Sequence, residues 1–275
     1  MAAEDQCHEA YMQTGAGDLV DQDKNLHGDE VHGDNVLSDK TNAGNIDHDP
    51  IRLTRLFAPL IEGHIKLFAG RNAVLAAIDQ FIRKPAGSYL VVTAPAGFGK
   101  TALMARLVSG ASNAFAYHFF TAHYVETSLD ESFFLRNVVG QMAQWHGLTG
   151  QIPGRLNDLR ALYYQFRDEP LERTQVLVLD GLDEVTHWKL APYLSRRLHE
   201  KLRVIVTVRD MSQDRRDAYQ FPADQVTHLS LDGLTRDDVA QVLHAVGVAR
   251  PNASSLLDKV MRVSAYQANE ALGAD

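Results

Sequence analysis

The stretch TAPAGFGKTALM, residues 93–104, joins an apolar run of strand length, SYLVVTA, to a stretch with helical spacing, KTALMARLVSG. It approaches the phosphate-binding pattern G-x-x-x-x-G-K-[ST], with Ala94 in place of the first glycine. Because Ala94 falls where strand turns into loop, its methyl group is compatible with such a loop if the local φ is negative. The alternative interpretation is a turn that merely contains glycines before Lys100 and Thr101.

A phosphate-binding loop needs inward-facing backbone N–H groups, a lysine for the β- and γ-phosphates, and a hydroxyl for Mg²⁺. Gly97 and Gly99 leave room for close backbone approach, and Lys100 and Thr101 open a helix whose amino-terminal dipole favours anions. The loop residues expected to contact a nucleotide are Ala96, Gly97, Phe98, Gly99, Lys100, Thr101 and Ala102.

An acidic run follows a second apolar strand pattern in VLVLDGLDE, residues 176–184. Asp180 ends the strand and is the predicted Mg²⁺ ligand together with Thr101. Asp183 or Glu184 is the candidate to orient an attacking water. The alternative is a solvated acidic loop, although a bound cation would offset the repulsion among three neighbouring carboxylates.

A third strand pattern, RVIVTVRD, ends in Arg209. A cation at the tip of the strand next to the Mg²⁺ strand can touch the γ-phosphate and respond to its loss. Arg209 could instead pair with Asp210 or with another nearby acid. Three strand tips that meet at one edge of the sheet form the usual ligand site of an open α/β sheet.

Five runs of strand length alternate with stretches of helical spacing. The strand candidates are SYLVVTA (88–94), AFAYHFF (114–120), TQVLVLD (174–180), LRVIVTV (202–208) and QVTHLSL (225–231). The helix candidates are residues 71–84, 100–110, 130–147, 155–168, 235–247 and 252–264. Strands that are β-branched throughout rather than alternating indicate burial on both faces. The sequence therefore predicts an α/β, three-layer P-loop NTPase fold with a central, mostly parallel five-stranded sheet and a partial small helical domain after it.

The first fifty residues differ in composition, with twelve acidic residues against two lysines in a chain of net charge −8. They contain pentads, HGDEV, HGDNV, LSDKT, NAGNI and DHDPI, which favour a solvated, disordered tail over a narrow β-solenoid or stacking segment. We expect an acidic tail at 1–50, a linker at 51–66, an NTPase domain at 67–231 and an incomplete helical domain at 232–275.

Several classes of protein are disfavoured by composition. The single cysteine, Cys7, allows no disulfide framework within the chain, and the amino terminus has no signal-peptide pattern. No apolar run is long enough for a membrane span, and the near-neutral body has no basic stripe for nucleic acid. We expect a cytoplasmic protein without nucleic-acid or membrane partners. His118 and His123 are expected to be structural rather than metal ligands.

Together these motifs resemble the NACHT branch of the STAND NTPases, signalling relatives of the AAA+ ATPases. The resemblance spans roughly residues 68–264 and is carried by FAGR, APAGFGKT, YHFF, LVLDGLDE, VTVR and LDGLTRDDV. It implies ATP or ADP as ligand, with Phe68 to Arg71 near adenine and ribose, and Mg²⁺ at Asp180. It also implies Glu184 or Asp183 as the catalytic acid and Arg209 as the first sensor.

The family continues into a winged-helix lid and a long repeat array, whereas this sequence ends at Asp275. We therefore expect a cut-down or truncated member, or one whose remaining parts lie on another chain. Two functions stay open: a slow, Mg²⁺-dependent ATPase that resets a signalling switch, or a nucleotide-gated assembly module whose acidic tail recruits protein partners or self-assembles. A small-molecule or nucleotide kinase is a third alternative.

Overall fold

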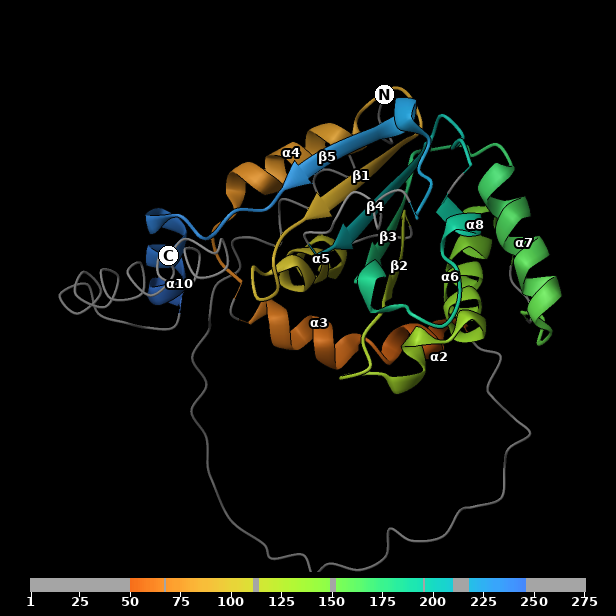
Figure 1. Cartoon of the computed structure of the whole chain (residues 1–275), viewed down its shortest axis with the longest axis horizontal. Helices are drawn as coiled ribbons and strands as arrows, with labels where there is room; N and C mark the ends of the chain where they lie inside the picture. Colours follow the sequence, from red (N-terminus) through yellow and green to blue (C-terminus); the bar gives the residue numbers. More distant parts are fainter. Residues whose placement is uncertain are drawn as a thin grey trace, which may run out of the picture.

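The computed structural model describes residues 50–245, except 67, 111–113, 149–151, 195 and 210–217. These residues fold around a five-stranded sheet in which every strand pair is parallel (Figure 1). The strands are β1 (Ser88–Thr93), β2 (Phe115–Phe119), β3 (Gln175–Asp180), β4 (Leu202–Val208) and β5 (Val226–Ser230). Each strand lies within a run expected from the sequence, so the α/β fold and its parallel sheet are confirmed.

The strand order is β2-β3-β4-β1-β5, which places β4 between β1 and β3. Thr93 of β1 lies beside Val208 of β4, and Leu179 of β3 lies beside Val206 of β4. Because the strands are parallel, their carboxyl ends share one edge of the sheet. The segments that follow β1, β3 and β4 therefore emerge next to one another.

The helices expected from the sequence are present wherever the structure describes them. They are α4 (Asn72–Ile82), α5 (Lys100–Ser109), α6 (Glu131–Trp145), α7 (Leu156–Asp168) and α10 (Arg236–Ala245). Among the described residues, the connections also contain a short helix, α8 (Ala191–Leu194), and the 3₁₀ turns η1 (Glu126–Leu129), η2 (Leu182–Glu184) and η3 (Ala223–Gln225).

Helices cover both faces of the sheet (Figure 1). Leu90 of β1 and Val178 of β3 pack into a buried cluster with α4 and α5. Their neighbours Val91 and Leu177 point the other way, into a cluster with α6, α7 and α8. This alternation within single strands is what a sheet buried on both faces requires, and it explains why β1, β3 and β4 are largely apolar instead of alternating between apolar and polar residues.

The linker expected at residues 51–66 is instead helical, and this expectation was wrong. The segment forms α2 (Pro50–Arg55) and α3 (Ala58–Ile65), with a proline at the start of α3, where its missing N–H costs nothing. Phe57 and Leu60 are 0% and 1% exposed, and the Phe57 ring lies 5.3 Å from that of His118. Phe57 and α3 are part of the buried cluster that contains α4 and α5, whereas α2 contacts α6, where the hydroxyl of Thr54 donates to Oδ1 of Asn137 at 3.4 Å.

The edge strand β2 is protected by side chains of α6. The side-chain amide of Gln141 accepts the N–H of Tyr117 and donates to the carbonyl oxygen of the same residue. Asn137 donates to that carbonyl as well and to Nδ1 of the fully buried His118, whose Nε2 lies 2.8 Å from the carbonyl oxygen of Ser128. His118 is therefore structural, as expected.

Some expectations concern residues outside the described part of the chain. The acidic tail up to residue 49 and the helix candidate at 252–264 belong to this group. Among the described residues, no helix has the length and apolar character needed to cross a membrane.

Candidate functional site

The loop between β1 and α5 is held open by two glycines with left-handed backbone. Gly97 has φ +82° and Gly99 has φ +85°, and a Cβ placed on either would meet no atom within 4 Å. The backbone conformation, rather than crowding, restricts these positions to glycine. Among the described residues, only Arg71 and Gln220 have a positive φ outside glycine. Ala94 therefore has the negative φ that its methyl group requires.

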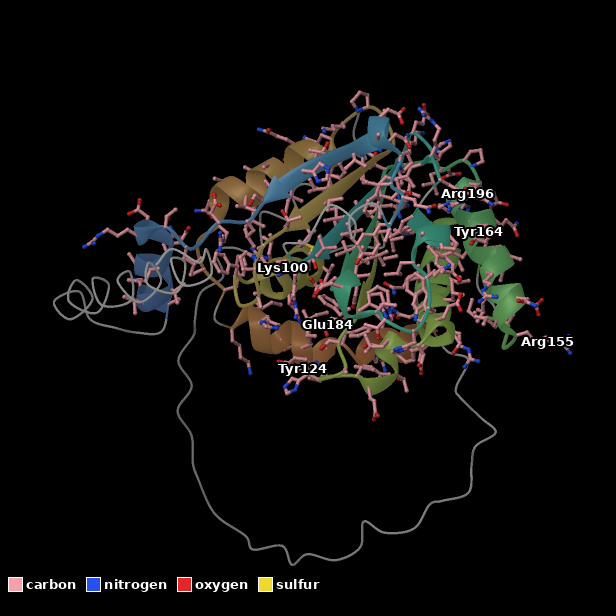
Figure 2. All side chains as sticks on the ribbon, viewed as in Figure 1. Lys100, Tyr124, Arg155, Tyr164, Glu184 and Arg196 are labelled. Atoms are coloured by element: carbon pink, nitrogen blue, oxygen red, sulfur yellow. The ribbon has the colours of Figure 1, made fainter. Side chains whose placement is uncertain are left out.

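Lys100 begins α5 and folds back over the loop. Its Nζ donates to the carbonyl oxygens of Ala94 at 2.7 Å and Pro95 at 3.0 Å. Burial lowers the pKa of Lys100, and the carboxylates of Asp183 and Asp180 oppose that effect. Lys100 and Glu184 lie on the same side of the molecule, near the strand ends, whereas Tyr164 and Arg196 lie on another side (Figure 2).

Asp180, the last residue of β3, is 3% exposed and receives a hydroxyl on each carboxylate oxygen. Thr101 of α5 donates to Oδ2 at 2.8 Å, and Thr207 of β4 donates to Oδ1 at 2.6 Å. Burial raises the pKa of Asp180, and these two hydrogen bonds limit the rise. Three elements far apart in sequence thus meet at one carboxylate.

Arg209 follows β4 and contacts both remaining acids of the run. Its Nε lies 3.0 Å from Oδ2 of Asp183, its backbone N–H donates to Oδ1 of the same residue at 2.9 Å, and its Nη2 pairs with Oε1 of Glu184. Of the two roles considered for Arg209, the structure shows the pairing with nearby acids. The partners are Asp183 and Glu184.

Gly181 separates Asp180 from the two acids of η2 by a turn that only glycine fits. Its φ is +78°, and a Cβ there would lie 2.8 Å from the carbonyl oxygen of Phe120. Its N–H donates to the hydroxyl oxygen of Thr207 at 2.8 Å. The turn allows Asp180 to face α5 while Asp183 and Glu184 face Arg209.

Arg71 joins the loop to the segment before α10. Its Nη2 donates to the carbonyl oxygen of Phe98 at 3.1 Å and its Nη1 to that of Asp232 at 2.6 Å. Its backbone N–H donates to Oδ1 of Asp238 at 2.7 Å, and Oδ2 of Asp238 accepts the N–H of Thr235 at the start of α10. The FAGR segment is thereby fixed beside the loop.

Phe68 and Phe98 are half-buried against the cluster that contains α4 and α5. Both lie in segments that Arg71 connects, so the site residues expected from the sequence form one region. Ala96 is exposed and Ala102 half-buried in the first turn of α5.

Residues 76–209 match the family model described as nephrocystin 3, N-terminal. The match begins inside α4 and ends at Arg209, so it contains the loop after β1, the acidic run after β3 and the tip of β4. No curated protein matches the chain. The chain is thus similar to the nephrocystin 3 amino-terminal family over just under half of its length.

Two contributors to the site were not predicted as site residues. Thr207 orients Asp180, and the signal for it in the sequence is the hydroxyl next to the carboxyl end of the strand run LRVIVTV. Asp238 fixes the backbone of Arg71 across 167 positions of sequence. No local pattern connects two such distant residues, so only the fold identifies that contact.

Proposed function

We propose that this protein binds a nucleoside triphosphate, ATP by resemblance, together with Mg²⁺ at the carboxyl edge of its sheet, and hydrolyses it slowly as a conformational switch. The observation that carries the proposal is the meeting of Thr101, Asp180 and Thr207 beside a glycine loop that ends in Lys100. A hydroxyl and a buried carboxylate next to a loop lysine are the donor set that a metal–triphosphate complex needs.

The residues fit Mg²⁺ by the chemistry of their donors. Mg²⁺ in nucleotide sites uses one or two protein oxygens and fills the remaining positions with water and phosphate oxygens. Thr101 and Asp180 supply oxygens that already lie 2.8 Å apart. The described residues hold no group of three or more His, Cys, Asp or Glu side chains suited to a metal.

The loop fits phosphate oxygens for a separate reason. The first N–H groups of a helix have no acceptor within it, and the positive end of the helix dipole lies there. In α5 those groups follow Gly97 and Gly99, beside which there is open space. Lys100 would exchange its two loop carbonyls for β- and γ-phosphate oxygens.

The acidic run supplies the groups for hydrolysis. Bound Mg²⁺ would neutralise phosphate charge as it builds up. Glu184, 40% exposed in its side chain, would take the proton of an attacking water, while Asp183 keeps its hydrogen bond to the backbone of Arg209. The NACHT-like resemblance spans these residues and supports the proposal, and the nephrocystin 3 match covers the same segment.

A nucleotide-gated assembly module without turnover is the second candidate, and one contact favours it. Arg209 pairs with both Asp183 and Glu184, so the candidate base is engaged by a cation. In that case the acidic tail would recruit protein partners or other copies of the chain while the nucleotide serves as a structural ligand.

Turnover by the purified full chain separates the two candidates. We expect wild-type protein to release phosphate from ATP only with Mg²⁺, and Glu184→Gln to bind ATP while turning it over about a hundredfold more slowly. If Asp183→Asn has that effect and Glu184→Gln does not, the two acids exchange roles. Binding without any Mg²⁺-dependent turnover would favour the assembly module.

A further inference from the structure

Asp238, in the first turn of α10, binds backbone N–H groups at the starts of two helices. Its Oδ1 accepts the N–H of Arg71 at 2.7 Å, and its Oδ2 accepts the N–H of Thr235 at 3.0 Å. The hydroxyl of Thr235 in turn accepts the N–H of Asp238 at 3.1 Å, which completes a reciprocal cap of α10. Since Arg71 directly precedes α4, one carboxylate connects the starts of α4 and α10.

The fit between Asp238 and the segment before α4 is tight. Gly70 has φ +76°, and a Cβ placed on it would lie 2.4 Å from Oδ1 of Asp238. Arg71 has φ +61°, a left-handed conformation that residues other than glycine rarely adopt. Because this conformation costs free energy, it persists only where a contact holds it. The carboxylate of Asp238, which accepts the N–H of Arg71, is such a contact.

The side chain of Arg71 carries this anchoring to the nucleotide loop. Its Nη2 donates to the carbonyl oxygen of Phe98 at 3.1 Å, and its Nη1 donates to that of Asp232 at 2.6 Å. Arg71 is 8% exposed, so its guanidinium group depends on partners within the protein rather than on water. The position of Phe98 in the loop is thereby tied to Arg71.

Holding the carbonyl group of Phe98 also sets the direction of an N–H group of the loop. This carbonyl and the N–H of Gly99 belong to one planar trans peptide, so they point in opposite directions. Gly99 directly precedes α5, and its N–H has no acceptor within that helix. The contact with Arg71 therefore turns an N–H that is available to a phosphate oxygen away from Arg71.

We propose that Asp238 is a positioning residue for the nucleotide loop, because it fixes Arg71, which orients the peptide between Phe98 and Gly99. The inference rests on the proposed nucleotide site and adds to it a residue of α10. Positioning and binding are reciprocal: if Asp238 raises the affinity for the nucleotide, the bound nucleotide stabilises the contacts of Asp238 by the same factor.

The place of α10 allows this contact to be changed without disturbing the sheet. The helix lies to one side of the layers that cover the sheet (Figure 1). Its buried side chains, Val239 and Leu243, belong to neither of the two clusters that cover the sheet faces. We therefore expect variants of Asp238 to keep the folded sheet, which thermal melting checks.

Equilibrium titration of the full chain with fluorescent ATP and Mg²⁺ tests the inference on Asp238→Asn. This change keeps the volume but replaces one of the two acceptor oxygens with an N–H donor. We expect the affinity to fall about fivefold, as the loss of one hydrogen bond predicts. Asp237→Asn is the matched control, since it removes the same charge from an exposed residue of the same helical turn. It should bind as wild type does.

Arg71 variants show whether the effect travels through the proposed route. In an Arg71→Ala background the connection to Phe98 is missing, so Asp238→Asn should lower the affinity no further. Gly70→Ala disturbs the same contact from the other side, because its Cβ crowds Oδ1 of Asp238 without a change of charge. It should lower the affinity as Asp238→Asn does, and it serves as the second variant if Asp238→Asn melts early.

Hydrogen exchange supplies a readout that a purely structural role of Asp238 would not change. The amide hydrogens of Arg71 and Thr235 are held by Asp238, so saturating ATP with Mg²⁺ should slow their exchange about fivefold in wild-type protein. In Asp238→Asn the slowing should be smaller.

Three results would overturn the inference and leave the proposed nucleotide site standing. They are unchanged affinity in both Asp238→Asn and Gly70→Ala, a loss in Asp238→Asn that persists without Arg71, and amide exchange at Arg71 and Thr235 that ATP does not alter. Failure of the wild-type protein to bind ATP would overturn the proposed function itself, and the inference with it.

Discussion

Thr207 donates its hydroxyl hydrogen to Asp180 across 2.6 Å and accepts the N–H of Gly181 on the same oxygen at 2.8 Å. The threonine is fully buried, and Asp180 is 3% exposed. A buried polar group must find its partner within the protein, so this pair fixes the direction of the Asp180 carboxylate. The strand between β1 and β3 thus supports the proposed Mg²⁺ ligand.

Thr207→Val should separate the contribution of the Thr207 hydrogen bonds from that of its packing. Valine fills the same volume but leaves the N–H of Gly181 and Oδ1 of Asp180 without their partner, at a cost of about 1–3 kcal/mol in the free energy of unfolding. Thr207→Ser keeps the hydroxyl and should recover most of the loss. Urea denaturation measures both variants. A valine variant as stable as wild type would mean that the hydrogen bonds contribute nothing.

The Mg²⁺ concentration needed for nucleotide binding should distinguish the two Thr207 variants as their stability does. We expect Thr207→Val to need more Mg²⁺ for half-maximal binding than Thr207→Ser, because the Asp180 carboxylate is no longer held by β4. A shift in stability without a shift in the Mg²⁺ dependence would limit Thr207 to a structural role.

The sheet and most of the site could be predicted from the sequence because their signals are local. Strands buried on both faces can be recognised by their largely apolar composition, and Asp180 lies at the carboxyl end of one such strand. Lys100 and Thr101 follow a glycine loop of fixed spacing. Each of these features depends on neighbours in sequence, which is why the predicted strands, and the places of these residues at the strand ends, agree with the structure.

Other features depended on distant contacts. The helices α2 and α3 are short, and the break between them at residues 56–57 hides their helical spacing, so the sequence predicts a linker there. The contacts of Arg71 with Asp238 and of Arg209 with Glu184 join residues brought together only by the sheet order. Periodicity carries no information about such pairs.

Phe57→Ala tests whether α2 and α3 belong to the folded core. Phe57 is fully buried, and its ring lies 5.5 Å from Phe119 and 6.4 Å from Phe133, so its truncation should cost about 3–5 kcal/mol. Leu56, the preceding residue, is 45% exposed and provides the control: Leu56→Ala should cost far less. A similar, small loss in both variants would restore the linker interpretation.

His118 gives the fold a predictable sensitivity to acid. Burial lowers the pKa of His118 to about 4, against a usual value of 6.5. Below pH 6.5 the unfolded chain gains a proton that the folded chain excludes, because Nδ1 faces the side-chain amide of Asn137. The contribution of neutral His118 to the free energy of unfolding is therefore present above pH 6.5 and is lost as the pH falls towards 4.

Between roughly pH 7 and pH 4.5, His118 should lower the free energy of unfolding by about 2 kcal/mol. His118→Gln cannot take up the proton, so its free energy of unfolding should fall by about that much less over the same range. Urea denaturation at the two pH values compares the variants. An identical loss in both would show that other groups account for the acid sensitivity.

The most direct test of the proposed nucleotide site is an equilibrium titration of the full chain with fluorescent ATP and Mg²⁺, comparing wild type, Lys100→Ala and Lys201→Ala. Lys201 is the matched control. It lies just before β4, at the other edge of the sheet, and its Nζ donates to the carbonyl oxygen of Glu172. We predict saturable binding to wild type and to Lys201→Ala, and an affinity at least about tenfold lower, or about 1.4 kcal/mol, for Lys100→Ala. Unchanged affinity in Lys100→Ala would contradict the assignment of the site.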